Sequence, residues 1–235
     1  MLIMKIIEFI KQELTGWKDY EIIGLFIVLM VILFTTVTFN DSPIAVISAI
    51  CGILYTIIAG KGKISCYFFG LAGSGCYIWL SFHNALWGNL LLYLCYYIPM
   101  QILGIFKWKQ HLKKSTKEII KTHLTKSELI KLTAVSIIGC ITAIVFLKHF
   151  GDSSPVIDGI TTALSIAGMY LTVKRCIEQW IIWMIVNGLS AIMWLNLVIH
   201  GAKAYATVIM WSVYFILAIY FYIVWKKELD LQKQP

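Results

Sequence analysis

Residues 177–199 read IEQWIIWMIVNGLSAIMWLNLVI, with one carboxylate near the start and no other charged side chain. A helix that crosses a lipid bilayer needs about 20 mostly apolar residues, and this stretch is long enough. Of the 235 residues in the chain, 60% are hydrophobic and 14% are charged, whereas an average soluble domain has about 25% charged residues. A soluble core of this length cannot bury so much apolar surface. The sequence therefore predicts an all-α integral membrane protein.

Stretches of the same character recur along the chain, separated by turn residues such as Asn40-Asp41-Ser42-Pro43. The expected membrane spans, about eight in number, are residues 21–39, 43–60, 64–82, 87–107, 131–149, 155–173, 177–199 and 204–225.

The basic residues predict how these spans are oriented. If the N-terminus faces the cytoplasm, only Lys148 and Lys203 of the 20 Lys and Arg residues fall on the opposite side. Lys and Arg are enriched in cytoplasmic loops, so we expect both termini in the cytoplasm. The net charge of +8 is spread over short clusters between apolar runs, which argues against nucleic acid as a partner.

The chain also repeats itself at a spacing of about 115 residues: Ser42-Pro43 and Ser154-Pro155 each open an apolar block, and Tyr97 and Trp108 align with Tyr214 and Trp225. One span lies between the two blocks, so both cross the membrane in the same direction. Such parallel repeats place a substrate at their interface near the bilayer midplane.

The expected organisation, in chain order, is an amphipathic surface helix over residues 1–15, an extra transmembrane helix over 21–39, a first three-helix repeat over 43–107, a basic cytoplasmic loop over 108–130, a linking transmembrane helix over 131–149, a second three-helix repeat over 155–225 and a cytoplasmic tail over 226–235.

Two polar stripes are candidate substrate-binding residues. Trp180, Trp183 and Asn187 are spaced i, i+3 and i+7, so they share one helical face. Packing explains such a face equally well at Trp180, which lies near the inner end. It explains Trp183 and Asn187 less well, because a polar side chain deep in a membrane protein usually faces the protein interior.

The second stripe lies in span 87–107 and repeats every four residues, through Asn89, Tyr93, Tyr97 and Gln101. Pro99 removes a backbone donor beside Gln101, so we expect a kink there. An interhelical hydrogen bond that serves packing alone is the alternative for Gln101.

The remaining tryptophans and the carboxylates lie near the ends of the spans. We expect most of Trp79, Trp87, Trp194, Trp211 and Trp225 to be anchors at the membrane surface. Asp158 and Glu178 also lie close to span ends, where water reaches them. No carboxylate is expected at mid-depth, which favours facilitated diffusion over coupling to protons.

The chain has no motif for catalysis or for a metal. The six cysteines contain no Cys-x-x-Cys pair, and the Gly-rich phosphate loop, His-Glu-x-x-His and Gly-x-Ser-x-Gly are absent. We therefore expect no cofactor and no enzymatic activity. Two other classes are a membrane-embedded enzyme, which needs converging catalytic groups, and a structural subunit, which needs no deep polar stripe.

The motifs Trp180-x-x-Trp183-x-x-x-Asn187 and Tyr97-x-Pro99-x-Gln101-x-x-Gly104-x-x-x-Trp108, together with the parallel repeat, resemble the PnuC family of bacterial nicotinamide riboside transporters. The resemblance covers spans two to eight. It implies a SWEET-like fold, a homotrimer in the bacterial cytoplasmic membrane, and uptake of a vitamin nucleoside by facilitated diffusion, driven by phosphorylation inside the cell. Related members carry thiamine or riboflavin, which remain alternatives.

Nicotinamide riboside has a positively charged pyridinium ring, and a Trp face attracts a cation by roughly 0.5–2 kcal/mol. The resemblance therefore implies that Trp180, Trp183 and Tyr97 hold the ring, while Asn187, Gln101 and Asn89 bind its amide and ribose hydroxyls. Thiamine also carries a cationic ring.

Overall fold

A computed structural model describes residues 17–112 and 119–232, and its secondary structure there is helical apart from isolated bridges. In chain order the elements are α2 (Asp19–Phe39), α3 (Pro43–Gly60), α4 (Cys66–His83), α5 (Trp87–Leu92), the π-helical turn η1 (Tyr93–Tyr97), α6 (Ile98–Lys109), α7 (Lys126–His149), α8 (Pro155–Lys174), α9 (Gln179–Ile199) and α10 (Tyr205–Gln232). The expected surface helix over 1–15 lies outside the described residues.

Local sequence fixes where several helices begin. Pro43 and Pro155 occupy the first turns of α3 and α8, where a missing backbone N–H removes no helical hydrogen bond. Thr125 and Glu128 form a capping box at the start of α7, in which each side chain bonds the other's backbone. Consequently α7 begins inside the segment 108–130 that we expected to be a loop.

The third helix after α2 is built from three pieces, α5, η1 and α6, which together run over Trp87–Lys109. The N–H of Ile98 donates to the carbonyl of Tyr93, five residues back, which widens this turn. Pro99 follows directly and supplies no donor of its own. Wide turns of this kind occur mostly inside α-helices and often at functional sites.

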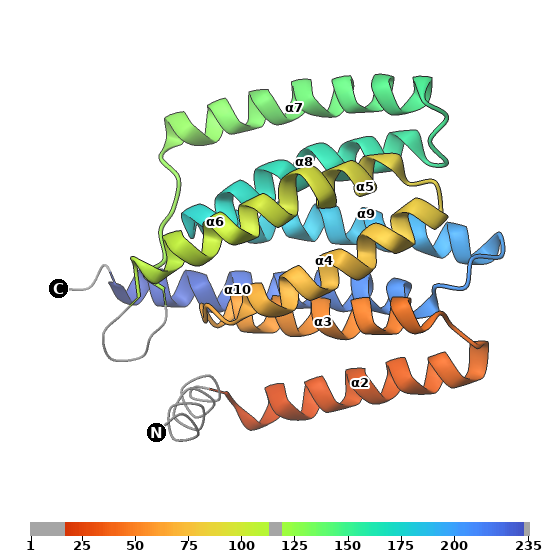
Figure 1. Cartoon of the computed structure of the whole chain (residues 1–235). Helices are drawn as coiled ribbons and strands as arrows, with labels where there is room; N and C mark the ends of the chain where they lie inside the picture. The colour runs from red at the N-terminus through yellow and green to blue at the C-terminus, as the bar shows by residue number, and fades with distance from the viewer. Residues whose placement is uncertain (1–16, 113–118, 233–235) are drawn as a thin grey trace.

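Within the described residues, seven helices are long and apolar enough to cross a membrane. Among the expected spans, only the one that corresponds to α4 falls short of that hydropathy, because its sequence includes Gly70, Gly73, Gly75 and two serines. In Figure 1, α4 nevertheless runs alongside the other helices within the bundle. The all-α membrane architecture expected from the sequence is confirmed.

Two helices flank a central group. Figure 1 shows α2 along one edge of the bundle and α7 along the opposite edge. Helix α7 packs mainly on α8, and α2 packs on α10 and α3. Both flanking helices are largely exposed, with 6% of the apolar window of α2 and none of that of α7 buried. These exposed faces are apolar, as contact with lipid requires.

Two buried indoles join the halves of the central group in matching ways. Trp108, at the end of α6, donates its Nε1–H to the carbonyl of Thr172 in α8, at 3.2 Å. Trp225, in α10, donates to the carbonyl of Gly60 at the end of α3, at 2.7 Å. Both indoles are fully buried. The last helix of each expected repeat is thus bonded to the first helix of the other.

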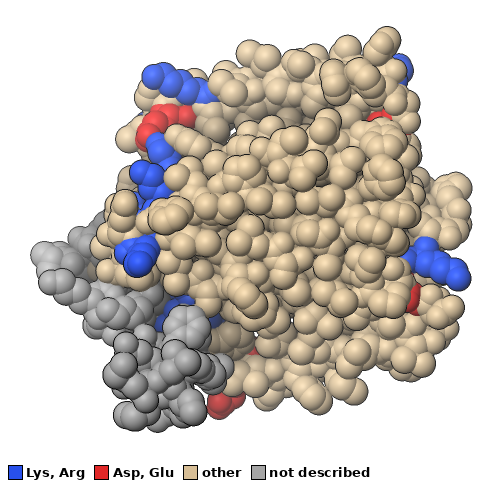
Figure 2. Space-filling view, in the orientation of Figure 1, with Lys and Arg blue, Asp and Glu red and all other residues tan. Residues whose placement is uncertain are grey.

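Most Lys and Arg residues visible in Figure 2 gather at one end of the molecule. Figure 1 shows that this end contains the start of α2 and the end of α10. Helix α10 continues to Gln232, into the expected tail 226–235. Its Glu228 accepts a hydrogen bond from the buried ammonium of Lys121, which fixes the segment after the gap at residues 113–118 to this end.

This arrangement predicts the topology in the cell. Reporter fusions after Gln110 and after Gln232 should both give cytoplasmic signals, because the basic residues gather at the end where these positions lie. A reporter inserted between Gly201 and Ala202, at the opposite end of α9, serves as the control and should give a periplasmic signal. A periplasmic signal at either of the first two positions would contradict the orientation.

Candidate substrate chamber

A narrow chamber of about 90 Å³ lies between the halves of the central group, with room for several water molecules. Its walls come from α3, α4, η1, α6, α8, α9 and α10. The lining residues are Ser48, Gly52, Tyr55, Thr56, Ala59, Gly70, Gly73, Ser74, Tyr77, Tyr93, Tyr97, Gln101, Met169, Thr172, Gln179, Trp180, Trp183, Asn187, Met210, Trp211 and Tyr214.

The stripe predicted on α9 faces this chamber. Trp180, Trp183 and Asn187 all line it. Trp180 is 3% exposed and packs on the rings of Phe221 and Trp225, so it is no anchor at the membrane surface. The spacing i, i+3, i+7 was therefore sufficient to place these three side chains together.

Hydrogen bonds orient the ring of Trp183. Its Nε1–H donates to Oγ1 of Thr172 at 3.2 Å, and that hydroxyl lies 2.7 Å from Oε1 of Gln179, to which it donates. A Cβ added to Gly168 would lie 3.0 Å from the ring. A glycine at position 168 thus lets the indole lie flat against α8, with its other side available to the chamber.

The stripe on α5, η1 and α6 is only partly brought together. Tyr93, Tyr97 and Gln101 line the chamber, and the rings of Tyr93 and Tyr97 lie 4.5 Å apart, centroid to centroid. The wide turn at η1 explains this alignment, because it brings residues four apart closer to one face than an α-helix does. Asn89 precedes the wide turn and does not line the chamber.

Gln101 has one satisfied group and one free group. Its Nε2 donates to Oγ of Ser74 at 2.8 Å, which fixes the orientation of the amide. Its Oε1 is buried and has no hydrogen-bond partner among the described residues, and the same holds for Nε1 of Trp180. A buried polar atom left without a partner costs about 1–3 kcal/mol. These two atoms are therefore available to a ligand that brings the missing donor and acceptor.

Asn89 lies toward the opposite end of the bundle, where it donates to Oδ1 of Asp158 at 2.6 Å. Asp158 is fully buried, and the carboxyl of Asp152 lies close enough to it for a hydrogen bond. The expectation that water reaches Asp158 was wrong, because α5 packs across the first turn of α8 and covers it. Asn89 thus joins two helices outside the chamber.

Several tryptophans expected at the membrane surface are buried inside the protein. Trp194, Trp211 and Trp225 are between 0% and 4% exposed, whereas Trp79 is 42% exposed. Trp194 donates to the hydroxyl of Tyr77 at 2.8 Å, across α4 and α9. Proximity to a span end did not distinguish a lipid-facing indole from one covered by a neighbouring helix.

Sequence reasoning missed the chamber residues on α3, α4, α8 and α10. One signal was present: the repeat aligns Tyr97 with Tyr214, and both line the chamber. Tyr55, Tyr77 and Trp211 complete an aromatic lining of five tyrosines and three tryptophans. Only contacts between separate helices bring these residues together.

The lining contains no Lys, Arg, His, Asp or Glu. Aromatic faces dominate, with amides at Gln101, Asn187 and Gln179. Negative aromatic faces attract cations without a formal counter-charge, and amides pair with hydroxyls and carboxamides. Among the described residues, no group of three His, Cys, Asp or Glu side chains is placed to hold a metal ion. The chamber is suited to a planar ring that carries polar groups.

Comparison with known proteins places this chamber in a family. Residues 42–227 match the family described as nicotinamide mononucleotide transporter. The chain is 33% identical to the nicotinamide riboside transporter PnuC of Neisseria mucosa, over 92% of this chain and 85% of that protein. It is also 33% identical to the protein of that name from Haemophilus influenzae, over 93% and 95% of the two chains.

A solved structure gives the same answer for the fold. The crystal structure of the vitamin B3 transporter PnuC superimposes with a TM-score of 0.83 and 33% identity, over 92% of this chain and 95% of that one. The matched family consists of transporters and not of enzymes, so the expectation of no enzymatic activity holds. From the aromatic chamber, the helical membrane fold and these matches together, the chain belongs to the PnuC family of membrane transporters.

Proposed function

We propose that this protein carries nicotinamide riboside across the bacterial cytoplasmic membrane, with the chamber as its binding site. The observation that carries this proposal is an uncharged aromatic chamber, with buried unpaired polar atoms, in a member of the PnuC family. The relatives named above are described as transporters of this nucleoside, which supports the same substrate here.

Each part of the nucleoside has a matching group in the chamber. The rings of Tyr97 and Trp183 lie 6.4 Å apart at 69° and form an aromatic corner for the pyridinium ring. Oε1 of Gln101 would accept from the carboxamide, and Asn187 would bind the ribose hydroxyls. Because no carboxylate lines the chamber, the cation would be held by ring faces alone, weakly enough to be released.

The overall architecture is proposed on similar grounds. We infer two parallel repeats, over 43–107 and 155–225, linked by the span that contains 131–149. The matching bonds of Trp108 and Trp225 support this inference. The lipid-exposed apolar faces of α2 and α7 are also where a homotrimer would form its contacts. Both termini would lie in the cytoplasm.

We further propose that transport is facilitated diffusion, driven by phosphorylation of the substrate inside the cell. A coupled carrier needs a group whose ion occupancy changes between its two states. The chamber supplies no ionisable acid or base of the usual coupling kind, and the nearest buried carboxyl described above, Asp158, is bonded to Asn89 outside it.

Substitution of Trp183 tests the aromatic site. Trp183→Ala should weaken nicotinamide riboside binding about five- to thirty-fold, since a lost cation–π contact is worth roughly 1–2 kcal/mol. Trp183→Phe should retain part of the affinity. Trp79→Ala, which removes an exposed indole from α4, is the matched control and should bind as the unaltered protein does. Unchanged calorimetric affinity in a folded Trp183→Ala protein would assign this indole to packing.

Calorimetry with three vitamins tests the substrate. Nicotinamide riboside should bind at least about tenfold more tightly than thiamine, which has a cationic ring but neither the carboxamide nor the ribose, each worth roughly 1 kcal/mol per hydrogen bond. Riboflavin, with its larger three-ring system, should not bind measurably in a chamber this narrow. Tighter binding of thiamine would reassign the substrate while leaving the site in place.

Proteoliposomes test the absence of coupling. Label should exchange into vesicles at a rate that does not change with an imposed proton or sodium gradient at clamped potential, because the chamber has no coupling group. The potential must be clamped, since each unit charge responds by about 2.3 kcal/mol per 100 mV. Gradient-driven accumulation that disappears in Asp158→Asn would identify a proton or ion site there and refute the proposal.

A further inference from the structure

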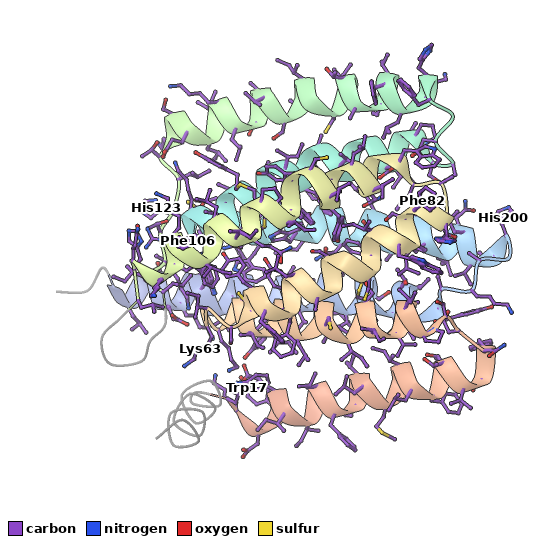
Figure 3. All side chains as sticks on the ribbon, in the orientation of Figure 1. Trp17, Lys63, Phe82, Phe106, His123 and His200 are labelled. Atoms are coloured by element: carbon purple, nitrogen blue, oxygen red, sulfur yellow. The ribbon has the colours of Figure 1, made fainter. Side chains whose placement is uncertain are left out.

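A second groove lies at the basic end of the molecule, separate from the chamber, with a cavity volume of about 490 Å³. It opens between α6, α8 and the segment that leads into α7. Figure 3 shows His123 of that segment at this end of the bundle. The lining residues are Met100, Leu103, Lys107, His111, Thr122, His123, Leu124, Glu128, Tyr170, Val173, Lys174, Arg175 and Cys176.

The groove is apolar at one level and cationic at the next. Leu103 precedes Lys107 by one helical turn on α6, and Tyr170 precedes Lys174 by one turn on α8. A turn rises about 5.4 Å. Leu103 and Tyr170 are each 42% exposed, at the depth of the outermost acyl carbons. The cationic rim of Lys107, Lys174 and Arg175 lies above them, where lipid headgroups lie.

The positive charge of this rim is not neutralised by the described residues. Glu128 is the single carboxylate in the lining, and it is 3.4 Å from the ammonium of Lys174. The same carboxylate accepts from the backbone N–H of Thr125, as part of the α7 cap. The side chain of Lys107 forms no hydrogen bond or ion pair with any described residue. One carboxylate therefore faces three fixed cations.

The remaining rim residue is held in place by backbone. Nη1 of Arg175 donates to the carbonyl of Ile120 at 2.9 Å, and the N–H of Thr122 donates to the carbonyl of Arg175 at 2.9 Å. These bonds engage neutral partners, so they position the guanidinium without cancelling its charge. A preformed cationic rim above an apolar wall is the pattern expected of a site for an anionic lipid between transmembrane helices.

We propose that this groove binds one anionic phospholipid of the cytoplasmic leaflet, with its phosphate against Lys107, Lys174 and Arg175 and an acyl chain along Leu103 and Tyr170. A free phosphate compound would satisfy the rim but leave the apolar wall uncovered, so the wall selects the lipid. The site joins α6 to α8, which belong to different halves of the central group. The proposal does not depend on which substrate the chamber carries.

Binding of phosphatidylglycerol to the full-length protein tests the site, measured by native mass spectrometry and by a fluorescent analogue. Lys107→Gln combined with Lys174→Gln should weaken phosphatidylglycerol binding about ten- to thirty-fold, as each Lys near an anionic headgroup contributes about a fivefold factor. Phosphatidylcholine, which has no net charge, should bind the unaltered protein no better than it binds the double variant.

A matched control separates this groove from general surface charge. Lys226→Gln combined with Lys227→Gln removes the same charge from exposed positions of α10 at the same end of the molecule, and should leave phosphatidylglycerol binding unchanged. Equal losses in the two double variants would overturn the proposal. If the first double variant does not fold, Lys107→Gln alone serves in its place, with about a fivefold loss expected.

Two further arms identify the source of the phosphate. Glycerol 3-phosphate and inorganic phosphate carry the headgroup chemistry without acyl chains, and an excess of either should not displace the lipid. Leu103→Ser should weaken lipid binding while the rim is intact. Displacement by either soluble phosphate, with Leu103→Ser having no effect, would assign the groove to a soluble anion and overturn the lipid proposal.

Discussion

The hydrocarbon interior of a membrane offers no hydrogen-bond partner, so each polar group at that depth needs one inside the protein. The indoles of Trp108 and Trp225 answer this constraint by donating to backbone carbonyls of Thr172 and Gly60 in the opposite half. These bonds hold the last helix of each half against the first helix of the other. The chamber between the halves depends on this contact, because its walls come from both.

The same constraint explains why ionised groups are confined to the ends of the bundle while the chamber has none. Lys61 pairs with Glu21 at 2.6 Å, and Lys121 pairs with Glu228, both at the basic end. At the opposite end, Asp158 is bonded to Asn89. A charge buried at mid-depth is costly unless it is paired. Aromatic rings provide attraction for a cation at that depth without this cost, and they leave the site electrically neutral when it is empty.

The chamber and the groove are complementary in chemistry. The chamber presents neutral ring faces and amides, which suit a small cationic ring with polar substituents. The groove presents fixed cations above an apolar wall, which suits a phosphate that carries an acyl chain. Both sites use α6 and α8, so Gln101 and Lys107 lie less than two turns apart on one helix. A change in how α6 and α8 pack would therefore alter both sites.

The sequence by itself determined the class of protein, its helical spans and one face of the chamber. Apolar length and the scarcity of charge decide membrane insertion, and these are properties of composition. Trp180, Trp183 and Asn187 could be grouped because they share one regular helix, where spacing fixes direction. Asn89 could not be separated from Tyr93, Tyr97 and Gln101, because the intervening π-helical turn changes which residues share a face.

Tertiary structure alone decided the rest. Trp194, Trp211 and Trp225 resemble surface anchors in sequence, but neighbouring helices cover them. The burial of a side chain depends on what packs against it, and that partner lies far away in sequence. The groove required the same information, since Lys107 and Lys174 are separated by α7 in the chain. Only the packing of α6 against α8 brings these two cations to one phosphate-sized site.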